Sequence, residues 1–257
     1  MKETYIKETM KAELKNPVLV EGLPGMGMVG RIAARFFIKH FGAVRFAELY
    51  SPHFPYYALV NKKGSVRLLR CEFFSCKNPT GDNDLVFLVG DSQAQTIEGQ
   101  YEVTNAILDY AVKLGVKTIV TIGGYRQEAD EAPRVVAVST SPELLEKALK
   151  AKAVASPAGN PIVGTAGLML GLAKFRKVDA LCLLGETRGY LPDPVAARSI
   201  LEVLAGMLGL KVDYAALDAQ IEKSKEIVTK MQEIEERREK FSQKMRRSEE
   251  ERVTYIS

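Results

Sequence analysis

The sequence predicts an α/β fold: a doubly wound, mainly parallel sheet with a short antiparallel addition, followed by a long C-terminal helical tail. Apolar runs such as "DLVFLVGD" and "VKTIVTIGGY" alternate with stretches of helical periodicity, which is the pattern of βαβ units. Several runs end in glycines followed by polar residues, as strands do where loops leave a sheet. From Tyr214 onward glycine and proline disappear and Lys, Arg and Glu dominate. We therefore predict an α/β body over residues 1–213 and a charged helical tail over residues 214–257.

The first half of the body is predicted element by element. The run "PVLVEG" is a core strand that Pro17 opens, and "MVGRIAARFFIKHFG" is a helix that Gly42 ends. The run "AVRFAELY" is a second strand. The runs "YYALV" and "SVRLLRCEFF" flank "NKKG", which predicts an antiparallel hairpin.

The second half repeats the alternation. The stretch "TIEGQYEVTNAILDYAVKLG" is a helix that ends at Gly115, between the buried strands "DLVFLVGD" and "VKTIVTIGGY". "RVVAVST" is a strand, and Ser141 and Pro142 open the helix "SPELLEKALK" as its N-cap and first-turn proline. "VGTAGLMLGLAKF" predicts a buried helix, "VDALCLLGET" the last buried strand, and "DPVAARSILEVLAGMLG" the helix that covers it.

Composition narrows the possible functions. The 257 residues are 46% hydrophobic and 26% charged, and the net charge of +4 predicts neither a nucleic-acid-binding nor a membrane-binding face. No apolar run reaches the roughly 18 residues of a membrane-spanning helix. The three cysteines lack metal-ligand spacing and only two histidines are present, so we expect no disulfide framework, no metal and no cofactor. These features and the polar N-terminus predict a cytoplasmic protein.

The stretch "GLPGMGMVG" raises the question of a phosphate site, because Gly25, Gly27 and Gly30 satisfy G-x-G-x-x-G. In the dinucleotide fingerprint the first glycine directly follows the strand, whereas here "EGLP" intervenes and we expect the strand to have ended. A Walker A loop would need Lys and Ser or Thr where Arg31 and Ile32 stand. We therefore predict that these glycines form a turn and permit close helix–sheet packing.

Four glycine-containing loops are expected at the carboxyl ends of the strands, where open sheets gather functional groups. An enzyme could use Asp91 and Glu186 as a carboxylate pair, with Arg188 or Arg126 binding an anion. The favoured interpretation is that these side chains bind one another and the loop backbones. The candidate ligand crevice comprises Gly25, Gly27, Gly30, Asp91, Gln93, Tyr125, Glu186 and Arg188.

The tail carries a narrow apolar seam among balanced charges. A seam of this kind on a very polar helix favours a helix that packs against another chain's copy or projects from the body. The alternative is a surface helix folded back on its own domain. The seam consists of Ile227, Met231, Ile234, Phe241 and Met245, with Arg238 as its one break.

Several motifs together resemble the proteasome assembly chaperone family, in particular its archaeal members. They are, in order, "GLPGMGMVG", "GDSQ" with "EGQYEVTNAILDY", "TIGGY", "GTAGLMLGLAK" and "CLLGETRGYLPDPVAA". The resemblance covers residues 17–217 and implies a phosphorylase-like α/β body, a homo-oligomer without catalysis, and the proteasome as partner. Some relatives are assembly chaperones, and others are ATP-independent activators that dock C-terminal tails between α-subunits.

Tail docking in that family implies a terminal hydrophobic-Tyr-any tripeptide, whose tyrosine enters a pocket and whose carboxylate pairs with a lysine. This chain ends in "RVTYIS", which places Tyr255 third from the end and Thr254 before it. The candidate docking tip is Val253, Tyr255, Ile256 and Ser257. The alternatives are a frayed terminus and a contact of the tip within its own oligomer.

The sequence thus predicts a non-enzymatic chaperone or activator that oligomerises and binds the α-ring of the 20S proteasome. The alternative is a small-molecule or nucleotide-binding protein or enzyme that uses the crevice at the strand ends. A third possibility is a structural oligomer that the tails hold together.

Overall fold

The computed structural model describes residues 1–226 apart from residues 63, 79–80, 82 and 128–132. The chain divides into two compact units, Met1–Asp213 and Tyr214–Ser257. In the second unit, residues 215–226 are helical. The predicted seam and docking tip lie outside the described residues, and both stay predictions.

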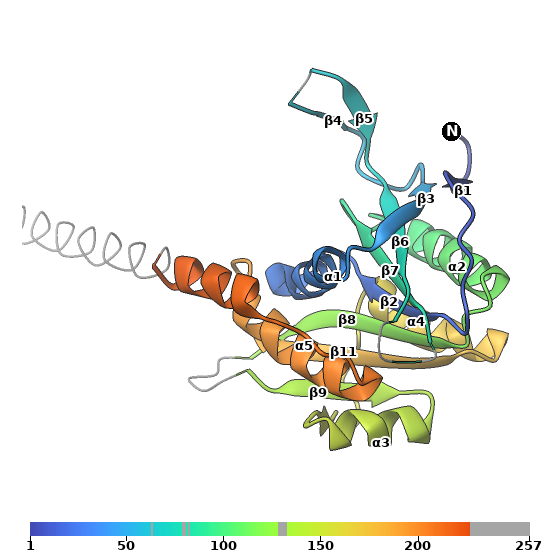
Figure 1. Ribbon diagram of the computed structural model, residues 1–257. Helices are drawn as coiled ribbons and strands as arrows, with labels where there is room; N and C mark the ends of the chain where they lie inside the picture. The colour runs from blue at the N-terminus through green and yellow to red at the C-terminus, as the bar shows by residue number, and fades with distance from the viewer. Residues whose placement is uncertain (63, 79–80, 82, 128–132, 227–257) are drawn as a thin grey trace, which may run out of the picture. The chain divides into compact units, whose positions relative to one another are not determined.

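The first unit is built on a nine-stranded mixed sheet with the strand order β1-β3-β6-β7-β2-β8-β11-β9-β10 (Figure 1). The central strands β7, β2, β8 and β11 run parallel, whereas β1, β3, β6 and β7 pair antiparallel. At the other edge, β9 is antiparallel to β11 and parallel to β10. In sheet order the strands are β1 (Tyr5–Glu8), β3 (Val44–Tyr50), β6 (Cys71–Cys76), β7 (Leu85–Gly90), β2 (Val18–Gly22), β8 (Thr118–Arg126), β11 (Asp179–Thr187), β9 (Val135–Ser139) and β10 (Val154–Ala155).

The parallel centre confirms the predicted α/β class, but the antiparallel part is larger than the short addition that the sequence predicted. It includes the strand over "AVRFAELY", which pairs with β1 and β6 instead of joining the parallel centre. The connection between β6 and β7 spans only residues 77–84. A link this short returns the chain antiparallel, because a parallel crossover needs a dozen residues or more.

Helices cover both faces of the sheet, as in a doubly wound fold (Figure 1). On one face α1 packs against α5 and lies over β2, β7 and β8, and α3 packs against α5 and β9. On the other face α2 packs against α4, which lies over β8 and β11. The helices are α1 (Val29–His40), α2 (Ile97–Lys113), α3 (Pro142–Lys150), α4 (Thr165–Ala173) and α5 (Pro194–Leu208), with 3-10 turns η1 (Met26–Met28) and η2 (Lys174–Arg176).

Local signals account for the helix ends. Ser141 and Pro142 hold the predicted N-cap and first-turn positions of α3. The Asp193 carboxylate accepts hydrogen bonds from the amides of Val195 and Ala196 and so caps the start of α5. Gly209 ends that helix with a φ of 64°.

Each face of the sheet has its own aromatic core. On the α1 face, the ring centroids of Phe37 and Phe87 lie 6.1 Å apart. On the α2 face, Tyr110 lies 5.1 Å from Phe73 and 6.4 Å from Phe46. The predicted buried helix α4 is buried along one side only, at Thr165, Met169, Leu170 and Ala173.

The predicted hairpin around "NKKG" forms a separate two-stranded sheet, β4 (Ala58–Val60) with β5 (Val66–Leu68). It extends away from the main sheet (Figure 1). Asn61 and Ser65 hydrogen-bond across the turn through their backbones and side chains.

Candidate functional site

The glycine stretch is a tight turn between β2 and α1. A Cβ on Gly22 would lie 2.2 Å from the carbonyl oxygen of Gly30, and a Cβ on Gly30 would lie 2.4 Å from that of Ile122 in β8. Real Cβ atoms do not approach backbone oxygens so closely, so both positions require glycine. Gly27 has a φ of 60°, and a Cβ there would lie 2.8 Å from the Thr187 hydroxyl. The turn therefore brings α1 against β2 and β8, as the sequence predicted.

Two details of that prediction need correction. The strand β2 continues through Glu21 to Gly22, because Glu21 still pairs with Leu88 on β7 and Thr121 on β8. Only two residues therefore separate the strand from Gly25, fewer than the sequence argument assumed. Gly25 itself is not tightly packed, since a Cβ there would find its nearest neighbour 3.8 Å away.

Gln93, a predicted crevice residue, connects three loops. Its side-chain amide donates to the carbonyl oxygen of Pro24 at 2.8 Å, and its oxygen accepts from the Thr165 amide at 3.0 Å. The Thr165 hydroxyl lies 3.2 Å from the same oxygen. Gln93 therefore ties the glycine turn to the start of α4.

Tyr125 and Glu186 come together, as neighbouring strands β8 and β11 require. The Tyr125 hydroxyl donates to the Glu186 carboxylate at 2.8 Å, and Arg134 donates to it from its backbone amide and its guanidinium, both at 2.9 Å. Burial alone would raise the pKa of Glu186, but the bonds from Arg134 and Tyr125 outweigh it and hold the pKa below its usual value.

Asp91 lies in a different cluster. Its carboxylate accepts a bidentate pair of bonds from Arg67 at 2.5 and 3.0 Å, and a third bond from the Arg70 amide at 3.1 Å. These contacts outweigh burial and keep the pKa of Asp91 below its usual value. Arg67 belongs to β5, so this ion pair joins the hairpin to the body.

The carboxylate pair of Asp91 with Glu186, which the enzyme alternative needed, is therefore wrong. Asp91 follows β7 and Glu186 lies on β11, and β2 and β8 stand between these strands. Three strand spacings amount to about 14 Å. Each carboxylate instead binds its own arginine.

Other polar residues of the loops at the strand ends also contact one another. Arg126 hydrogen-bonds to the Tyr190 hydroxyl, and its guanidinium lies 4.7 Å from that ring's centroid. The Thr187 hydroxyl donates to Asp193 at 2.7 Å, and the Asp193 amide donates to the Gly27 carbonyl at 2.8 Å. Arg188 directly follows β11. The favoured interpretation, that these groups bind one another and the loop backbones, agrees with these contacts.

Sequence reasoning missed Glu21, a carboxyl inside the central strand β2. Its exposed fraction is 1%, one oxygen accepts the Leu23 amide at 2.8 Å, and the other has no hydrogen-bond partner. Burial raises the pKa of Glu21 to about 7, against the effect of the Leu23 bond. The signal was present in the sequence as an acid within the apolar run "VLVEG".

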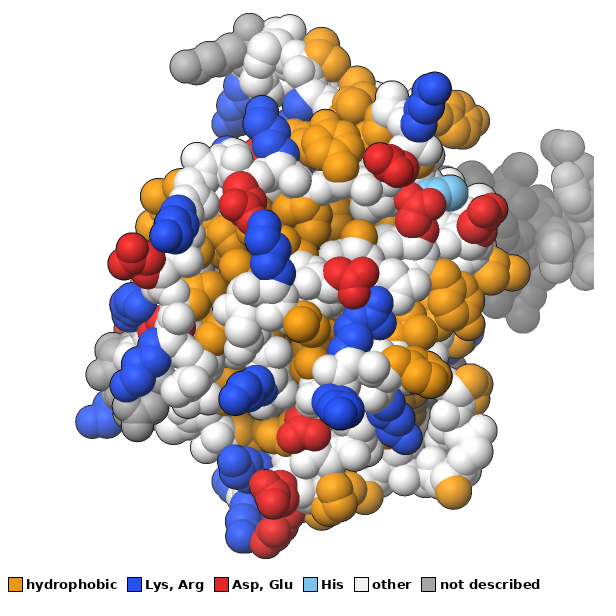
Figure 2. Space-filling model, turned by 90° about the vertical axis from the view of Figure 1, so that its right-hand side faces the viewer, with side chains coloured by type: hydrophobic (Ala, Val, Ile, Leu, Met, Phe, Trp, Pro, Cys, Tyr) orange, Lys and Arg blue, Asp and Glu red, His pale blue; other side chains and the backbone are white. Residues whose placement is uncertain are grey.

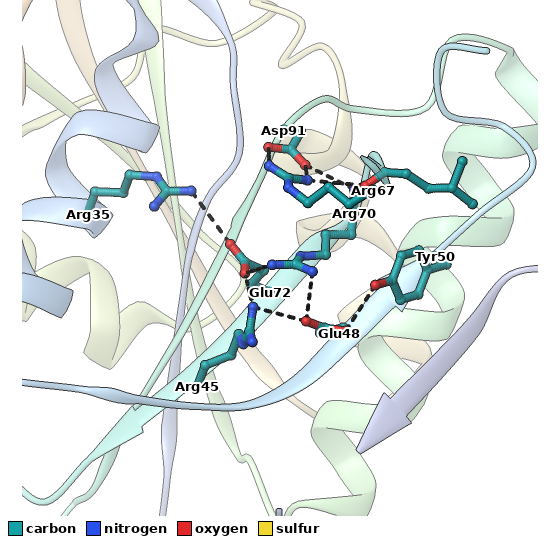
Figure 3. Close-up of polar contacts among 9 residues, drawn as sticks. Arg35, Arg45, Glu48, Tyr50, Arg67, Arg70, Glu72 and Asp91 are labelled. Carbon is teal, nitrogen blue, oxygen red and sulfur yellow. Dashed lines mark hydrogen bonds and ion pairs between the residues drawn. The ribbon is translucent and has the colours of Figure 1, made fainter. Parts of the chain in front are cut away.

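A network of ion pairs, also missed, occupies the α1 side of β3 and β6 (Figure 3). Glu48 and Glu72 lie directly opposite each other on the two strands, where two like charges would repel. The Arg70 guanidinium bridges them, at 2.9 Å from the Glu48 carboxylate and 2.8 Å from the Glu72 carboxylate. The Arg45 guanidinium also bridges them, at 3.0 Å from the Glu48 carboxylate and 2.7 Å from the Glu72 carboxylate.

The edges of this network come from other elements. Arg35 reaches Glu72 from α1 at 3.7 Å, and the Tyr50 hydroxyl donates to Glu48 at 2.9 Å. Arg67 and Asp91 lie beside Arg70 (Figure 3). Five separate segments therefore meet at one charged surface: α1, β3, β5, β6 and the loop that follows β7.

A second surface lies at the base of the hairpin. A cavity of about 400 Å³ is lined mostly by apolar side chains, among them Phe54, Tyr57 and Leu69. Figure 2 shows apolar side chains gathered beneath the hairpin at the top of the view. On the hairpin, Val60 and Val66 are 70% and 64% exposed. Apolar side chains so exposed are typical of surfaces that bind other proteins.

Within the described ranges, no three His, Cys, Asp or Glu side chains are grouped so that they could hold a metal ion. No helix in that part of the chain is long and apolar enough to span a bilayer.

Comparison with known proteins identifies the family. Residues 19–232 match the PAC2 family, and the chain belongs to that family. An uncharacterized protein of Methanocaldococcus jannaschii is 32% identical over 244 residues, which cover 95% of this chain and 93% of that protein.

Two solved structures from Pyrococcus furiosus are similar over most of their length. PbaB, described as an archaeal proteasome activator, has 37% sequence identity and a TM-score of 0.86, covering 90% of this chain and 100% of PbaB. PbaA, described as an archaeal homolog of proteasome-assembly chaperone, has 26% identity and a TM-score of 0.74, covering 99% of this chain and 100% of PbaA.

Proposed function

We propose that this PAC2-family protein is a non-enzymatic proteasome chaperone or activator, which binds the α-ring of the 20S proteasome or its free α-subunits. The observation that carries the proposal is the similarity to PbaB, an archaeal proteasome activator, over the whole length of that protein. The similarity to PbaA supports the same class of partner. The higher identity with PbaB favours activation over assembly.

The contacts at the strand ends support a non-catalytic role. Asp91 and Glu186 are bound to arginines and kept charged, and Gln93 is engaged by two loops. A general acid or base would instead need a pKa near the working pH and access to a substrate. These contacts support the interpretation that the polar side chains at the strand ends hold the loops in place, and they disfavour the ligand-binding alternative.

We further propose that several copies associate and present their C-terminal tails together. Binding of one tail raises the effective concentration of the next, so weak contacts add up on a ring with repeated pockets. The tip Val253, Tyr255, Ile256 and Ser257 is the proposed contact, and the seam from Ile227 to Met245 is the proposed contact between copies.

The test is co-migration of the purified protein with free α-subunits and with intact 20S proteasome from the same organism. The full chain should bind, and a chain that ends at Glu250 should lose binding while its oligomer size on a sizing column is unchanged. Tyr255→Ala should weaken binding in the same direction. Hydrolysis of a fluorogenic peptide by the proteasome, with and without the protein, separates activation from chaperoning.

Each part of the proposal can fail separately. If the full chain binds neither free α-subunits nor the intact particle, the proteasome is not the partner. Equal binding by the chain that ends at Glu250 would show that the tail is not the contact. A smaller oligomer after truncation would show that the tails hold the copies together.

A further inference from the structure

The ion-pair network of β3 and β6 is layered by charge. Its carboxylates lie underneath: the side chains of Glu48, Glu72 and Asp91 are 8%, 12% and 10% exposed. Three of its guanidiniums lie on top, because the side chains of Arg35, Arg45 and Arg67 are 43%, 38% and 35% exposed. A molecule that approaches this surface therefore meets arginine side chains first. We define the arginine face as Arg31, Arg35, Arg45, Arg67 and Arg70.

The arginine face carries more positive charge than the network neutralises. The face and the network together contain five arginines and three carboxylates, an excess of two positive charges. Burial lowers the pKa of Arg35, and repulsion from Arg31 and Arg67 lowers it further. A crowded, partly desolvated guanidinium gains more from an added carboxylate than a fully hydrated lysine does, because it is weakly hydrated and holds its donors in a planar fork.

We propose that the arginine face binds an acidic polypeptide segment of a partner protein, whose carboxylates pair with the exposed guanidiniums. The charge of the face is complementary to such a segment. An aromatic pair borders the network, because Tyr50, which donates to Glu48, stacks on Tyr5 at 5.6 Å. Tyr5 is 47% exposed and offers apolar contact to the side chains of a peptide.

A polypeptide fits this surface better than a nucleic acid. Glu48, Glu72 and Asp91 lie just beneath the arginines and repel any added anion, so the face favours a ligand whose negative charges are spaced to meet individual guanidiniums. Carboxylates along a polypeptide can be spaced in this way, whereas a nucleic acid carries a phosphate at every nucleotide. The whole chain has a net charge of only +4, which gives little long-range attraction for so densely charged a polyanion. The arginine face uses no residue of the C-terminal tail, so this inference does not depend on the proteasome proposal.

The test measures binding of a fluorescein-labelled peptide of alternating glutamate and serine to the full-length protein by fluorescence anisotropy, at about 30 mM and about 300 mM NaCl. The variant is Arg31→Gln with Arg35→Gln, which removes two charges from α1. The control is Lys147→Gln with Lys174→Gln, which removes two exposed charges on α3 and η2, outside the arginine face. Thermal unfolding of each variant checks that it is folded.

The arginine variant should bind the peptide about tenfold more weakly at low salt, because it loses two partly exposed ion pairs with the peptide. The control should bind within about twofold of the natural chain, because screening weakens charges outside the site. Equal weakening in both would overturn the proposal and show non-specific attraction. Tighter binding of a single-stranded oligonucleotide of equal charge would also overturn it, in favour of phosphate. A change of sedimentation coefficient in the arginine variant alone would overturn it too, since the face would then hold a second copy of this chain.

Discussion

Removing the buried carboxyl of Glu21 should change how stability depends on pH. The pKa of Glu21 is raised from 4.5 to about 7 in the folded chain, so the folded state holds a proton that the unfolded state releases first. Between these two pKa values the folded state binds more protons, and the free energy of unfolding must fall as pH rises. The difference between these two pKa values corresponds to about 3 kcal/mol of stability, which is fully lost above the folded pKa.

Glu21→Gln keeps an oxygen that can accept the Leu23 amide but cannot ionise. We therefore expect its stability to decline less than that of the natural chain between pH 4.5 and pH 8, with a difference approaching about 3 kcal/mol. Urea unfolding at a series of pH values measures this difference, and all other titrating groups cancel between the two proteins. Glu146→Gln, at an exposed position on α3, is the control and should follow the natural chain. Parallel stability curves for Glu21→Gln and the natural chain would refute the reasoning.

Three further substitutions test the packing of the body. Gly30→Ala should lower the free energy of unfolding by about 2 kcal/mol or more in urea titrations, because its Cβ would overlap a carbonyl oxygen of β8. The control is Gly171→Ala, which has open space around it and should not destabilise α4. Asp193→Ala should cost about 1 to 2 kcal/mol in the same assay, because the amides at the start of α5 lose their cap. Arg67→Ala should speed hydrogen exchange in β4 and β5 relative to the β6 amides, because the bidentate contact with Asp91 is lost; unchanged exchange would show that the hairpin does not need it.

Much of the fold could be predicted from the sequence because its causes are local. Apolar periodicity located the strands and helices of the body, and the N-cap and glycine signals at Ser141, Gly42 and Gly115 lie where helices begin or end. The glycine turn was predicted as a packing device, and the close approach at Gly30 agrees. These features depend on residues within a few positions of each other, so a single sequence contains them.

What only the tertiary structure decided is which distant residues meet. The strand order places β2 and β8 between Asp91 and Glu186, so each carboxylate finds an arginine from another segment. The arginine face likewise needs α1, β3, β5 and β6 to converge. The sequence by itself determined the elements, because backbone sterics and apolar spacing act locally. Charge pairing and burial depend on how the sheet is ordered, and that order is a property of the whole chain.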